Sequence, residues 1–565
     1  MDRILRVDMA ALAARVEPLP QEYRLLGGRA LTSRIVADEV DPRCDPLGPK
    51  NKLVLAPGLL SGTPLSSSSR ISAGAKSPLT GGIKESNGGG QTGARLAQLG
   101  YRAVVIEGAP SGNGWWLMVV EPNGARFEPA DDLLGLGTFE TARRLFDRFG
   151  KKAALMVLGP AGEQMMNIAG ICNTDVEGRP SRLCARGGLG AVMGSKRLKA
   201  IVMPDCGWKP PVPVDESLWK IASKAYIKEL RTQPATSVRY PQFGTAATLE
   251  LVNKLGGLPI RNFRYGQDPR TDAISGFRMR EIILKRGGRP THSCMTGCAI
   301  QCSNVYTDEE GNEIASSMEF ETNGLLGANL EVFDFDAIAR FTRECNDLGV
   351  DTIETGGAIG VAMEAGLIPW GDVDGIFRLF REIRSGTVLG KLLGQGAGTT
   401  GKVLGVRRVP VVKNQTLSAY DPRAIKGNGV TYVTTPMGGD HTAGNTIALQ
   451  IDHLDPAGKV AISRQIQLQT TLLDVLGFCS FARGVLNATP QTFADLFNAR
   501  MGSNLTPDDM MAYALDVIRR EVRFNVAAGQ PAYERLPEWM REEPLPPHNA
   551  VFDVPEEEYS RIWDL

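Results

Sequence analysis

The chain separates into a part rich in short strands and a part rich in helices, and this order most constrains its fold. Before residue 207, short β-branched or aromatic runs are bounded by Gly, Pro or Asp, a pattern that predicts strands. The runs are ILRVDM, KLVLAPG, YRAVVIEG, WWLMVVEP, AALMVLG and KAIVMP. Strands followed by helices, rather than alternating with them, predict the α+β class.

A proline-rich connector, WKPPVPVD at 208–215, marks the first expected boundary. After it, Asp215 is placed to cap a helix in which Leu218, Ile221 and Tyr226 recur at near-helical spacing. Two further helices are expected at DFDAIARFTRECNDLG, ending at Gly349, and at VDGIFRLFREIRSG. A glycine-rich stretch precedes a second boundary near 412, and an irregular loop is expected at 426–445. The expected domains are a β-rich domain at 1–207 and two mainly α-helical domains at 208–412 and 413–565.

Charge and hydropathy exclude several classes of protein. Basic and acidic side chains balance at 63 each, so no overall field favours nucleic acid or an anionic membrane. No window reaches the roughly 18 apolar residues of a membrane span. The first residues are broken by Asp2, Arg3, Arg6 and Asp8 and do not resemble a signal peptide. We therefore expect a cytoplasmic protein.

Three of the nine cysteines, Cys294, Cys298 and Cys302, fall within the nonapeptide CMTGCAIQC. So dense a group in a large chain favours metal ligation over disulfides. A fourth thiol, Cys479, follows a predicted helix end at Gly477, and four thiolates suit a [4Fe–4S] cluster. A zinc site that uses the adjacent His292, or a chance group of buried thiols, also fits the spacing. The remaining cysteines, Cys44, Cys172, Cys184, Cys206 and Cys345, stand singly and are expected to be small buried apolar residues.

Three glycine-rich segments lie in the β-rich part, and two of them contain cations. They are RISAGAKSPLTGG at 70–82, ESNGGGQTG at 85–93 and SRLCARGGLGAVMGSK at 181–196. Glycine runs let backbone N–H groups approach an anion, and arginine adds charge-assisted hydrogen bonds. Hairpin turns explain any single segment equally well.

Together these motifs resemble the tungsten- or molybdenum-dependent aldehyde:ferredoxin oxidoreductase family along nearly the whole chain. The most specific pieces are KSPLTGG, SNGGG, RGGLGAVMGSKRLKAI, the cysteine trio and DVLGFC. The resemblance implies a β-rich base that cradles the cofactor and two helical domains that cover it. It also implies a [4Fe–4S] cluster, two pyranopterins that hold the metal through sulfur, and a magnesium ion that bridges their phosphates.

Carried onto this chain, the resemblance implies Cys294, Cys298, Cys302 and Cys479 as cluster ligands. Two family motifs of the form D-x-x-G-L-x correspond here to NDLGVD, residues 346–351, and DVLGFC, residues 474–479. Asn346 stands where the family has aspartate and offers one acceptor oxygen instead of two. The implied cofactor contacts are Arg70, Asn87, Gly88, Gly89, Arg182, Leu183, Arg186, Gly187, Asn346, Val350, Asp351, Asp474 and Phe478.

Two departures from the family pattern concern metal sites. The trio is spaced C-x₃-C-x₃-C, whereas the family has C-x₂-C-x₃-C. An E-x-x-H motif that binds a metal between subunits in some members reads EVFD at 331–334 here, without a histidine. An interfacial metal is therefore not expected, while a homodimer or hetero-oligomer stays open.

The resemblance also implies a glutamate and a histidine beside the metal. Glu319 and Glu321 are both candidates, because in an extended segment they share one side. His441 lies in a glycine-rich loop. The implied reaction is oxidation of an aldehyde to a carboxylic acid with water, with electrons passing to a ferredoxin-like or iron–sulfur acceptor. The active-site subunit of an aromatic acyl-CoA reductase and a non-catalytic iron–sulfur or zinc protein are the alternatives, and the sequence does not choose between tungsten and molybdenum.

Overall fold

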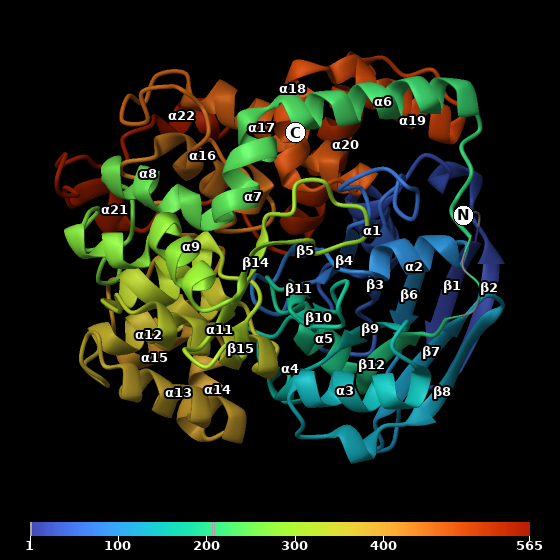
Figure 1. Ribbon diagram of the computed structural model, residues 1–565, viewed down its shortest axis with the longest axis horizontal. Helices are drawn as coiled ribbons and strands as arrows, with labels where there is room; N and C mark the ends of the chain where they lie inside the picture. Colours follow the sequence, from blue (N-terminus) through green and yellow to red (C-terminus); the bar gives the residue numbers. More distant parts are fainter. Residues whose placement is uncertain (1–2, 206, 208, 565) are drawn as a thin grey trace.

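Two six-stranded mixed sheets form the first third of the protein (Figure 1). The computed structural model describes residues 3–205, 207 and 209–564. The first sheet has the order β2-β1-β6-β3-β4-β5. Its strands are β1 (Arg3–Asp8), β2 (Ala13–Pro18), β3 (Leu53–Pro57), β4 (Ile71–Lys76), β5 (Ile83–Gly88) and β6 (Tyr101–Glu107).

The second sheet has the order β11-β10-β9-β12-β7-β8. Its strands are β7 (Trp116–Glu121), β8 (Gly124–Pro129), β9 (Ala154–Val157), β10 (Ile171–Asn173), β11 (Arg182–Cys184) and β12 (Leu198–Met203). β1 with β6 and β12 with β7 are the parallel pairs, and the other pairs are antiparallel. The helices of this part are α1 (Gly28–Glu39), α2 (Thr92–Gln98), α3 (Thr138–Phe149), α4 (Pro160–Glu163) and α5 (Leu189–Ser195).

The central strands of the first sheet, β3 and β6, are buried on both faces, which explains their nearly continuous apolar runs. Along β6, Val104 and Ile106 join the core shared with the second sheet. Ala103 and Val105 point the other way, into the larger core formed with α1 and the helical part. The sheet therefore connects the two cores.

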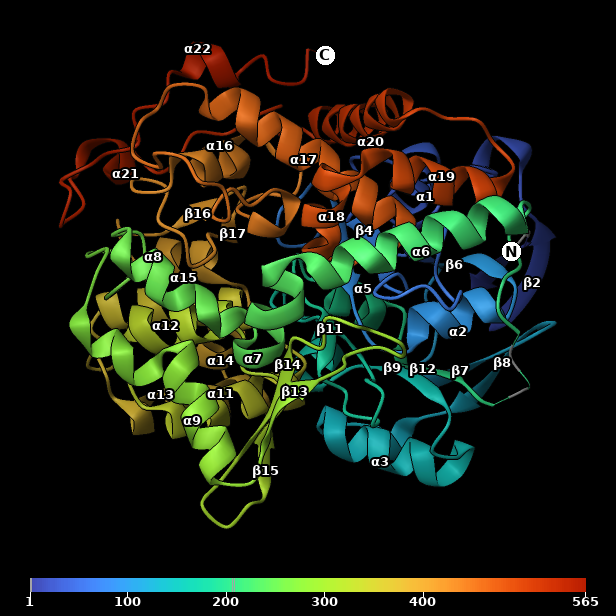
Figure 2. The same ribbon diagram turned by 45° about the horizontal axis from the view of Figure 1, so that its top comes forward.

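Helices cover the free face of this base and extend to one side of it (Figures 1 and 2). The longer helices are α6 (Glu216–Thr232), α9 (Gly276–Lys285), α11 (Phe335–Leu348), α12 (Thr352–Glu364), α13 (Val373–Ser385), α15 (Ala397–Leu404), α16 (Lys426–Thr434), α17 (Lys459–Leu476), α19 (Pro490–Met501) and α20 (Pro507–Ala527). The shorter ones are α7 (Tyr240–Phe243), α8 (Leu249–Lys254), α10 (Phe320–Thr322), α14 (Val388–Leu393), α18 (Arg483–Ala488), α21 (Glu538–Glu542) and α22 (Glu556–Tyr559). None of the described helices has both the length and the apolar composition to cross a bilayer.

Two small sheets interrupt the helical part. The first consists of β13 (Arg289–His292), β14 (Ser303–Thr307) and β15 (Glu313–Ala315), and the second of β16 (Val411–Val412) and β17 (Gln415–Thr416). The loop between β13 and β14 carries the cysteine trio. A strand–loop–strand unit thus holds the trio against the β-rich base.

The structure confirms the α+β class and most of the expected elements. The Asp215 side chain caps α6 by accepting a hydrogen bond from Leu218 N, and Gly349 ends α11 with a φ of 72°. Cys44, Cys172, Cys184 and Cys345 are buried as expected, and Cys206 lies outside the described residues.

Two local predictions are wrong. Ile221 is 67% exposed, and the buried face of α6 consists of Ala222, Tyr226 and Leu230. The first nine residues of the expected loop at 426–445 form α16 instead. Close packing explains the helix: a Cβ at Gly429 would lie 2.4 Å from Phe552 Cε2, and one at Gly427 would lie 2.7 Å from Thr446 Oγ1.

Candidate active site

The four candidate cysteine ligands come together from two distant segments. Cys479 lies two residues after Gly477, which ends α17 with a φ of 86°. The Cys479 N–H donates to the Ser67 carbonyl over 2.8 Å, and Ser67 Oγ lies 3.4 Å from Cys298 Sγ. The loop around Ser67 therefore joins Cys479 to the trio.

Burial and mutual repulsion act on these thiols together. Burial raises the pKa of Cys302, and the charges of Cys294 and Cys479 raise it further. Burial also raises the pKa of Cys479, while Arg70 lowers it. A cationic iron centre that displaces the protons of these thiols would relieve the repulsion between their charges.

The unusual spacing of the trio is accommodated in a turn. Cys298 N donates to the Met295 carbonyl, and Gly297 has a φ of 74° and open space where a Cβ would stand. His292 does not turn toward the thiols, because its Nε2 lies 3.1 Å from Asp175 Oδ2. Among the described residues, no three His, Cys, Asp or Glu side chains converge closely enough to bind one metal ion. In a cluster, by contrast, each thiolate binds a different iron.

Arg70 and Gly89 form a cradle beside Cys294. Arg70 precedes β4 and Gly89 follows β5, and the register places Ile71 opposite Gly88. The Arg70 guanidinium donates to the side-chain and backbone oxygens of Asn87. A Cβ at Gly89 would lie 3.5 Å from both Arg70 Nη1 and Cys294 Sγ. The missing side chain thus leaves a recess between a cation and a thiol.

Arg182 approaches the same thiol from β11. Both Arg182 and Arg70 lower the pKa of Cys294, although burial raises it overall to about 12. Arg182 Nη2 donates to Ser316 Oγ over 3.2 Å, while its Nε is buried without a protein partner. The next residue, Leu183, pairs with Cys172 in the sheet. Arg182 therefore has a donor left for a ligand.

Arg186 differs from the prediction of an anion-binding arginine. Its guanidinium donates to the carbonyls of Thr416 (2.5 Å) and Gly439 (2.8 Å) and to Asp351 Oδ2 (3.2 Å). Because protein oxygens engage its donors, Arg186 ties loops together rather than offering charge to a phosphate. The neighbouring Gly187 has a φ of 81° and packs against Lys84.

The carboxylates of the two implied cofactor motifs, Asp351 and Asp474, also have partners within the protein. Asp351 caps α12 by accepting from the N–H groups of Ile353 and Glu354, in addition to Arg186. Asp474 lies 3.5 Å from Arg29. Burial raises the pKa of Asp474, and the nearby Glu85 raises it further.

The other residues of these two motifs make mainly core contacts. The Asn346 carbonyl accepts from Thr138 Oγ1, and Val350 bridges to Ala169. The Phe478 ring packs 5.0 Å from both Tyr226 and Phe493. The Phe478 side chain is therefore an anchor of the core rather than a free contact surface.

Glu319 and Glu321 point to different surroundings, because the segment turns into helix α10 instead of continuing as a strand. Glu319 is held by the hydroxyls of Thr245 and Ser317. Its Oε1 lies 3.8 Å from Arg182 Nη1. Glu321 Oε2 accepts from Ala419 N over 2.8 Å, and its Oε1 lies 3.3 Å from His441 Nε2. The structure therefore pairs Glu321, and not Glu319, with His441.

The hydrogen bonds of Ser418 determine which ring nitrogen of His441 carries the hydrogen. Its oxygen accepts from Arg186 Nη1 (3.5 Å) and from the His441 backbone N–H (3.4 Å), which uses both lone pairs. The hydroxyl hydrogen is left to donate to His441 Nδ1, which lies 2.7 Å away. The neutral imidazole then carries its proton on Nε2, facing Glu321.

Burial drives both members of this pair toward their neutral forms. It raises the pKa of Glu321 to about 8, with Asp351 and Asp440 adding to the rise and Arg186 opposing it. It lowers the pKa of His441 to about 4. A carboxyl with a pKa near neutrality and a neutral imidazole form a competent acid–base pair.

Several residues of this network were missed in the sequence. Lys84 is fully buried and donates to Asp440 Oδ2 over 2.7 Å, which anchors the residue before His441. Arg29, Glu521 and Glu85 surround Asp474. Two adjacent charged residues, Lys84 and Glu85, inside a strand of the β-rich part are a sequence signal that could have revealed part of this network.

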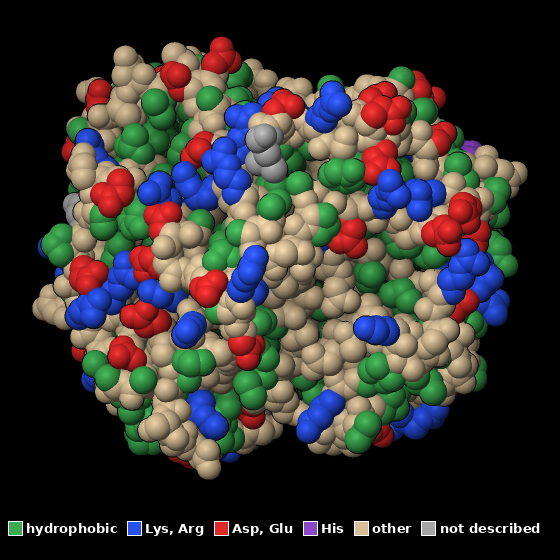
Figure 3. Space-filling view, turned by 180° about the vertical axis from the view of Figure 1, so that it is seen from behind, with side chains coloured by type: hydrophobic (Ala, Val, Ile, Leu, Met, Phe, Trp, Pro, Cys, Tyr) green, Lys and Arg blue, Asp and Glu red, His purple; other side chains and the backbone are tan. Residues whose placement is uncertain are grey.

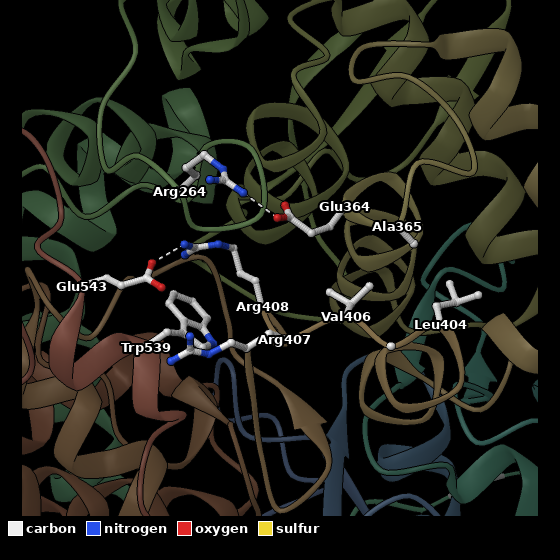
Figure 4. Close-up of a pocket in the computed structure, with 10 residues that line it drawn as sticks. Arg264, Glu364, Ala365, Leu404, Val406, Arg407, Arg408, Trp539 and Glu543 are labelled. Atoms are coloured by element: carbon white, nitrogen blue, oxygen red, sulfur yellow. Dashed lines mark hydrogen bonds and ion pairs between the residues drawn. The ribbon is translucent and has the colours of Figure 1, made fainter.

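A separate surface pocket of about 360 Å³ shares no residue with this site. Figure 4 shows that Arg264 pairs with Glu364 and Arg408 with Glu543 above the Trp539 ring. Arg407 has a partner as well, Glu538 at 3.2 Å. The arginines of this pocket are neutralised within the protein.

Comparison with known proteins identifies the family. Residues 4–205 match the model for the aldehyde ferredoxin oxidoreductase N-terminal domain, and residues 220–563 match the model for domains 2 and 3. The tungsten-containing aldehyde ferredoxin oxidoreductases of Pyrococcus furiosus and Thermococcus kodakarensis are each 32% identical, over 96% of this chain and 92% of their own.

A solved structure shares the fold. The active site complex BamBC of benzoyl coenzyme A reductase superposes with a TM-score of 0.81 at 17% identity, and covers 99% of this chain and 93% of the other. On the family-model and sequence matches together, the chain belongs to the aldehyde ferredoxin oxidoreductase family, whose members are oxidoreductases.

Proposed function

We propose that the protein oxidises an aldehyde to a carboxylic acid with water as the oxygen donor. The balanced reaction is RCHO + H₂O → RCOOH + 2H⁺ + 2e⁻, with the electrons passing to a ferredoxin-like acceptor. The observation that carries the proposal is the buried Glu321–His441 pair, in which a carboxyl of raised pKa faces an imidazole Nε2 over 3.3 Å. Water must lose a proton to attack a carbonyl, and this pair is built to take it.

The family's cofactors are a tungsten–pterin group and an iron–sulfur cluster. The residues present fit both. Cys294, Cys298, Cys302 and Cys479 supply four thiolates to a cluster. The recess at Gly89 and the unpartnered Arg182 Nε would receive an anionic pterin group next to it. When bound, the tungsten–pterin group supplies the acceptor for the two electrons.

The chain's own residues then handle the protons. Glu321 takes a proton from the attacking water, since its Oε1 has no other hydrogen-bond partner among the described residues. His441, whose Nε2–H faces Glu321 without substrate, would donate that hydrogen to the carbonyl oxygen of the bound aldehyde instead. Arg186 and Lys84 hold the loop that carries His441, through Ser418 and Asp440.

The test is anaerobic turnover by the metal-loaded protein with benzaldehyde or acetaldehyde and benzyl viologen. We expect one carboxylic acid for every two viologens reduced, together with tungsten in the protein. Reduction of benzoyl-CoA by low-potential dye, without aldehyde oxidation, would establish the acyl-CoA alternative. Tungsten-loaded protein inactive toward both substrates would refute aldehyde oxidation.

The pH dependence follows from Glu321. The base form acts, so kcat/KM should rise with pH, with a midpoint near the pKa of about 8, and level off above it. His441 stays neutral because its pKa is about 4, so its titration should cause no further change in kcat/KM between pH 5 and 7. The rise should disappear in Glu321→Gln, and a rate that falls across this range would contradict the assignment.

Gly89 offers a structural test of the cofactor recess. Gly89→Ala adds a methyl at ordinary contact distance, 3.5 Å from Arg70 Nη1 and Cys294 Sγ. Gly89→Leu would fill the space between them. We expect Gly89→Leu to retain much less tungsten than the wild type, by elemental analysis, while Gly89→Ala stays close to it. Full tungsten content in a folded Gly89→Leu protein would place the pterin elsewhere.

A further inference from the structure

Helix α6 presents a basic stripe to solvent. Lys220, Lys224, Lys228 and Arg231 are all exposed and follow one another at helical spacing on one face. Ile221 lies beside the first two lysines and is 67% exposed. An apolar side chain bordered by charges is the usual composition of a protein contact surface.

Among the described residues, these four cations have no carboxylate partner to neutralise their charge. Within the described part of the chain, none of them has an acidic oxygen within 4.0 Å. By contrast, Arg143 and Arg144 on α3 share Glu140. The face seen from behind in Figure 3 carries basic and acidic side chains side by side. The α6 stripe therefore projects positive charge outward.

The opposite face of α6 lies against the cysteines. Tyr226 is fully buried there. Its ring packs 5.0 Å from Phe478, the residue before Cys479. The stripe is thus separated from the cysteines by one helix, about 10–12 Å in diameter.

The exposed edge of the cysteine loop continues this surface. Thr296, Gly297 and Gln301 are exposed, and Thr296 Oγ1 donates to Gln91 at the start of α2. In Figures 1 and 2 the loop between β13 and β14 runs below α6 toward α2, on the outside of the molecule. A partner bound to the stripe would therefore also contact the exposed residues of the loop that carries the cysteine trio.

We propose that the α6 stripe and the Thr296–Gln301 loop form the docking surface for a small acidic electron-carrier protein. The proposal rests on the proposed function, since it names the partner that receives the electrons. Complementary charge raises the association rate and orients the carrier, and it adds less to the lifetime of the complex. That suits a carrier that must leave after each electron.

The experiment uses the metal-loaded protein with Lys220→Glu, Lys224→Glu and Lys228→Glu combined. The probe is a purified acidic [4Fe–4S] ferredoxin. We expect its KM to rise by about tenfold or more, whereas turnover with benzyl viologen stays as in the wild type. In the wild type the ferredoxin rate should fall as salt rises from about 0.01 M to 0.1 M, because the Debye length shrinks from about 30 Å to 10 Å. That salt dependence should be lost in the triple variant.

A matched control variant reverses the charge of three cations on the opposite side of the helical part, Arg381, Lys391 and Lys402. These side chains are exposed and likewise have no ion-pair partner within the described residues. The control should keep the wild-type KM for ferredoxin. An unchanged KM and salt dependence in the α6 variant would overturn the docking surface.

Direct binding separates this proposal from the proposed function. Calorimetric titration of oxidised ferredoxin at low salt requires no turnover, so it reports on docking even if no aldehyde is oxidised. Loss of binding in the α6 variant alone supports the surface. Wild-type protein that binds anionic vesicles but no ferredoxin would assign the stripe to a membrane and overturn the proposal.

Discussion

Replacing Glu321 by glutamine is expected to lower kcat by about 10²–10⁴-fold, the usual contribution of a positioned general base. Glutamine keeps the size of the side chain and can still accept from Ala419 N, so the fold should not change. It cannot take a proton from water. Turnover of aldehyde with benzyl viologen measures the effect, and KM should change far less than kcat because the substrate still binds.

Glu319→Gln is the matched control, since it makes the same change two residues earlier. Glu319 lies among the hydroxyls of Thr245 and Ser317 and near Arg182, away from His441. Its kcat should stay close to that of the wild type, with equal tungsten in both variants by elemental analysis. A larger loss of kcat in Glu319→Gln would identify Glu319, and not Glu321, as the general base. Full activity in both variants would show that neither glutamate takes part in the reaction.

Much of the fold could be predicted because local signals and tertiary structure agree. The six predicted strands correspond to β1, β3, β6, β7, β9 and β12, each marked by apolar residues and bounded by Gly, Pro or Asp. The sequence failed where packing overrides local preference. Glycines that suggested a loop at 426–445 are the small residues that let α16 pack under Phe552 and Thr446.

The candidate site was predictable only in part, because its members are far apart in the chain. The spacing of the trio predicts a metal site, whereas only a family motif could assign Cys479 to the same site. Lys84 and Asp440 are 356 residues apart in the sequence, so no local pattern predicts their ion pair. Glu319 and Glu321 could not be distinguished, because the turn into α10 depends on Thr245, whose hydroxyl accepts from Phe320 N.

Replacing Cys479 by serine is expected to remove the cluster's fourth thiolate and reduce electron transfer to ferredoxin to background. Serine is nearly isosteric but a poor ligand for iron at neutral pH, because its hydroxyl does not ionise. The Cys479 backbone bond to Ser67 should persist, so the polypeptide stays folded. Iron and sulfide analysis of anaerobically purified protein, with electron paramagnetic resonance after dithionite reduction, measures the loss.

Cys44→Ser provides the control for a buried thiol outside the group, since Cys44 is 8% exposed and belongs to the β-rich part. It should keep the iron, the sulfide and the resonance signal of the wild type. Tungsten content separates two causes of inactivity: a Cys479→Ser protein that retains tungsten but lacks iron has lost its electron exit and not its catalytic metal. Zinc in place of iron in the wild type would refute the cluster, and a full cluster in Cys479→Ser would show that this thiol is not a ligand. The first result would leave the trio and Cys479 as a structural metal site, and the second would require another donor, for which Ser67 Oγ, 3.4 Å from Cys298 Sγ, is a candidate.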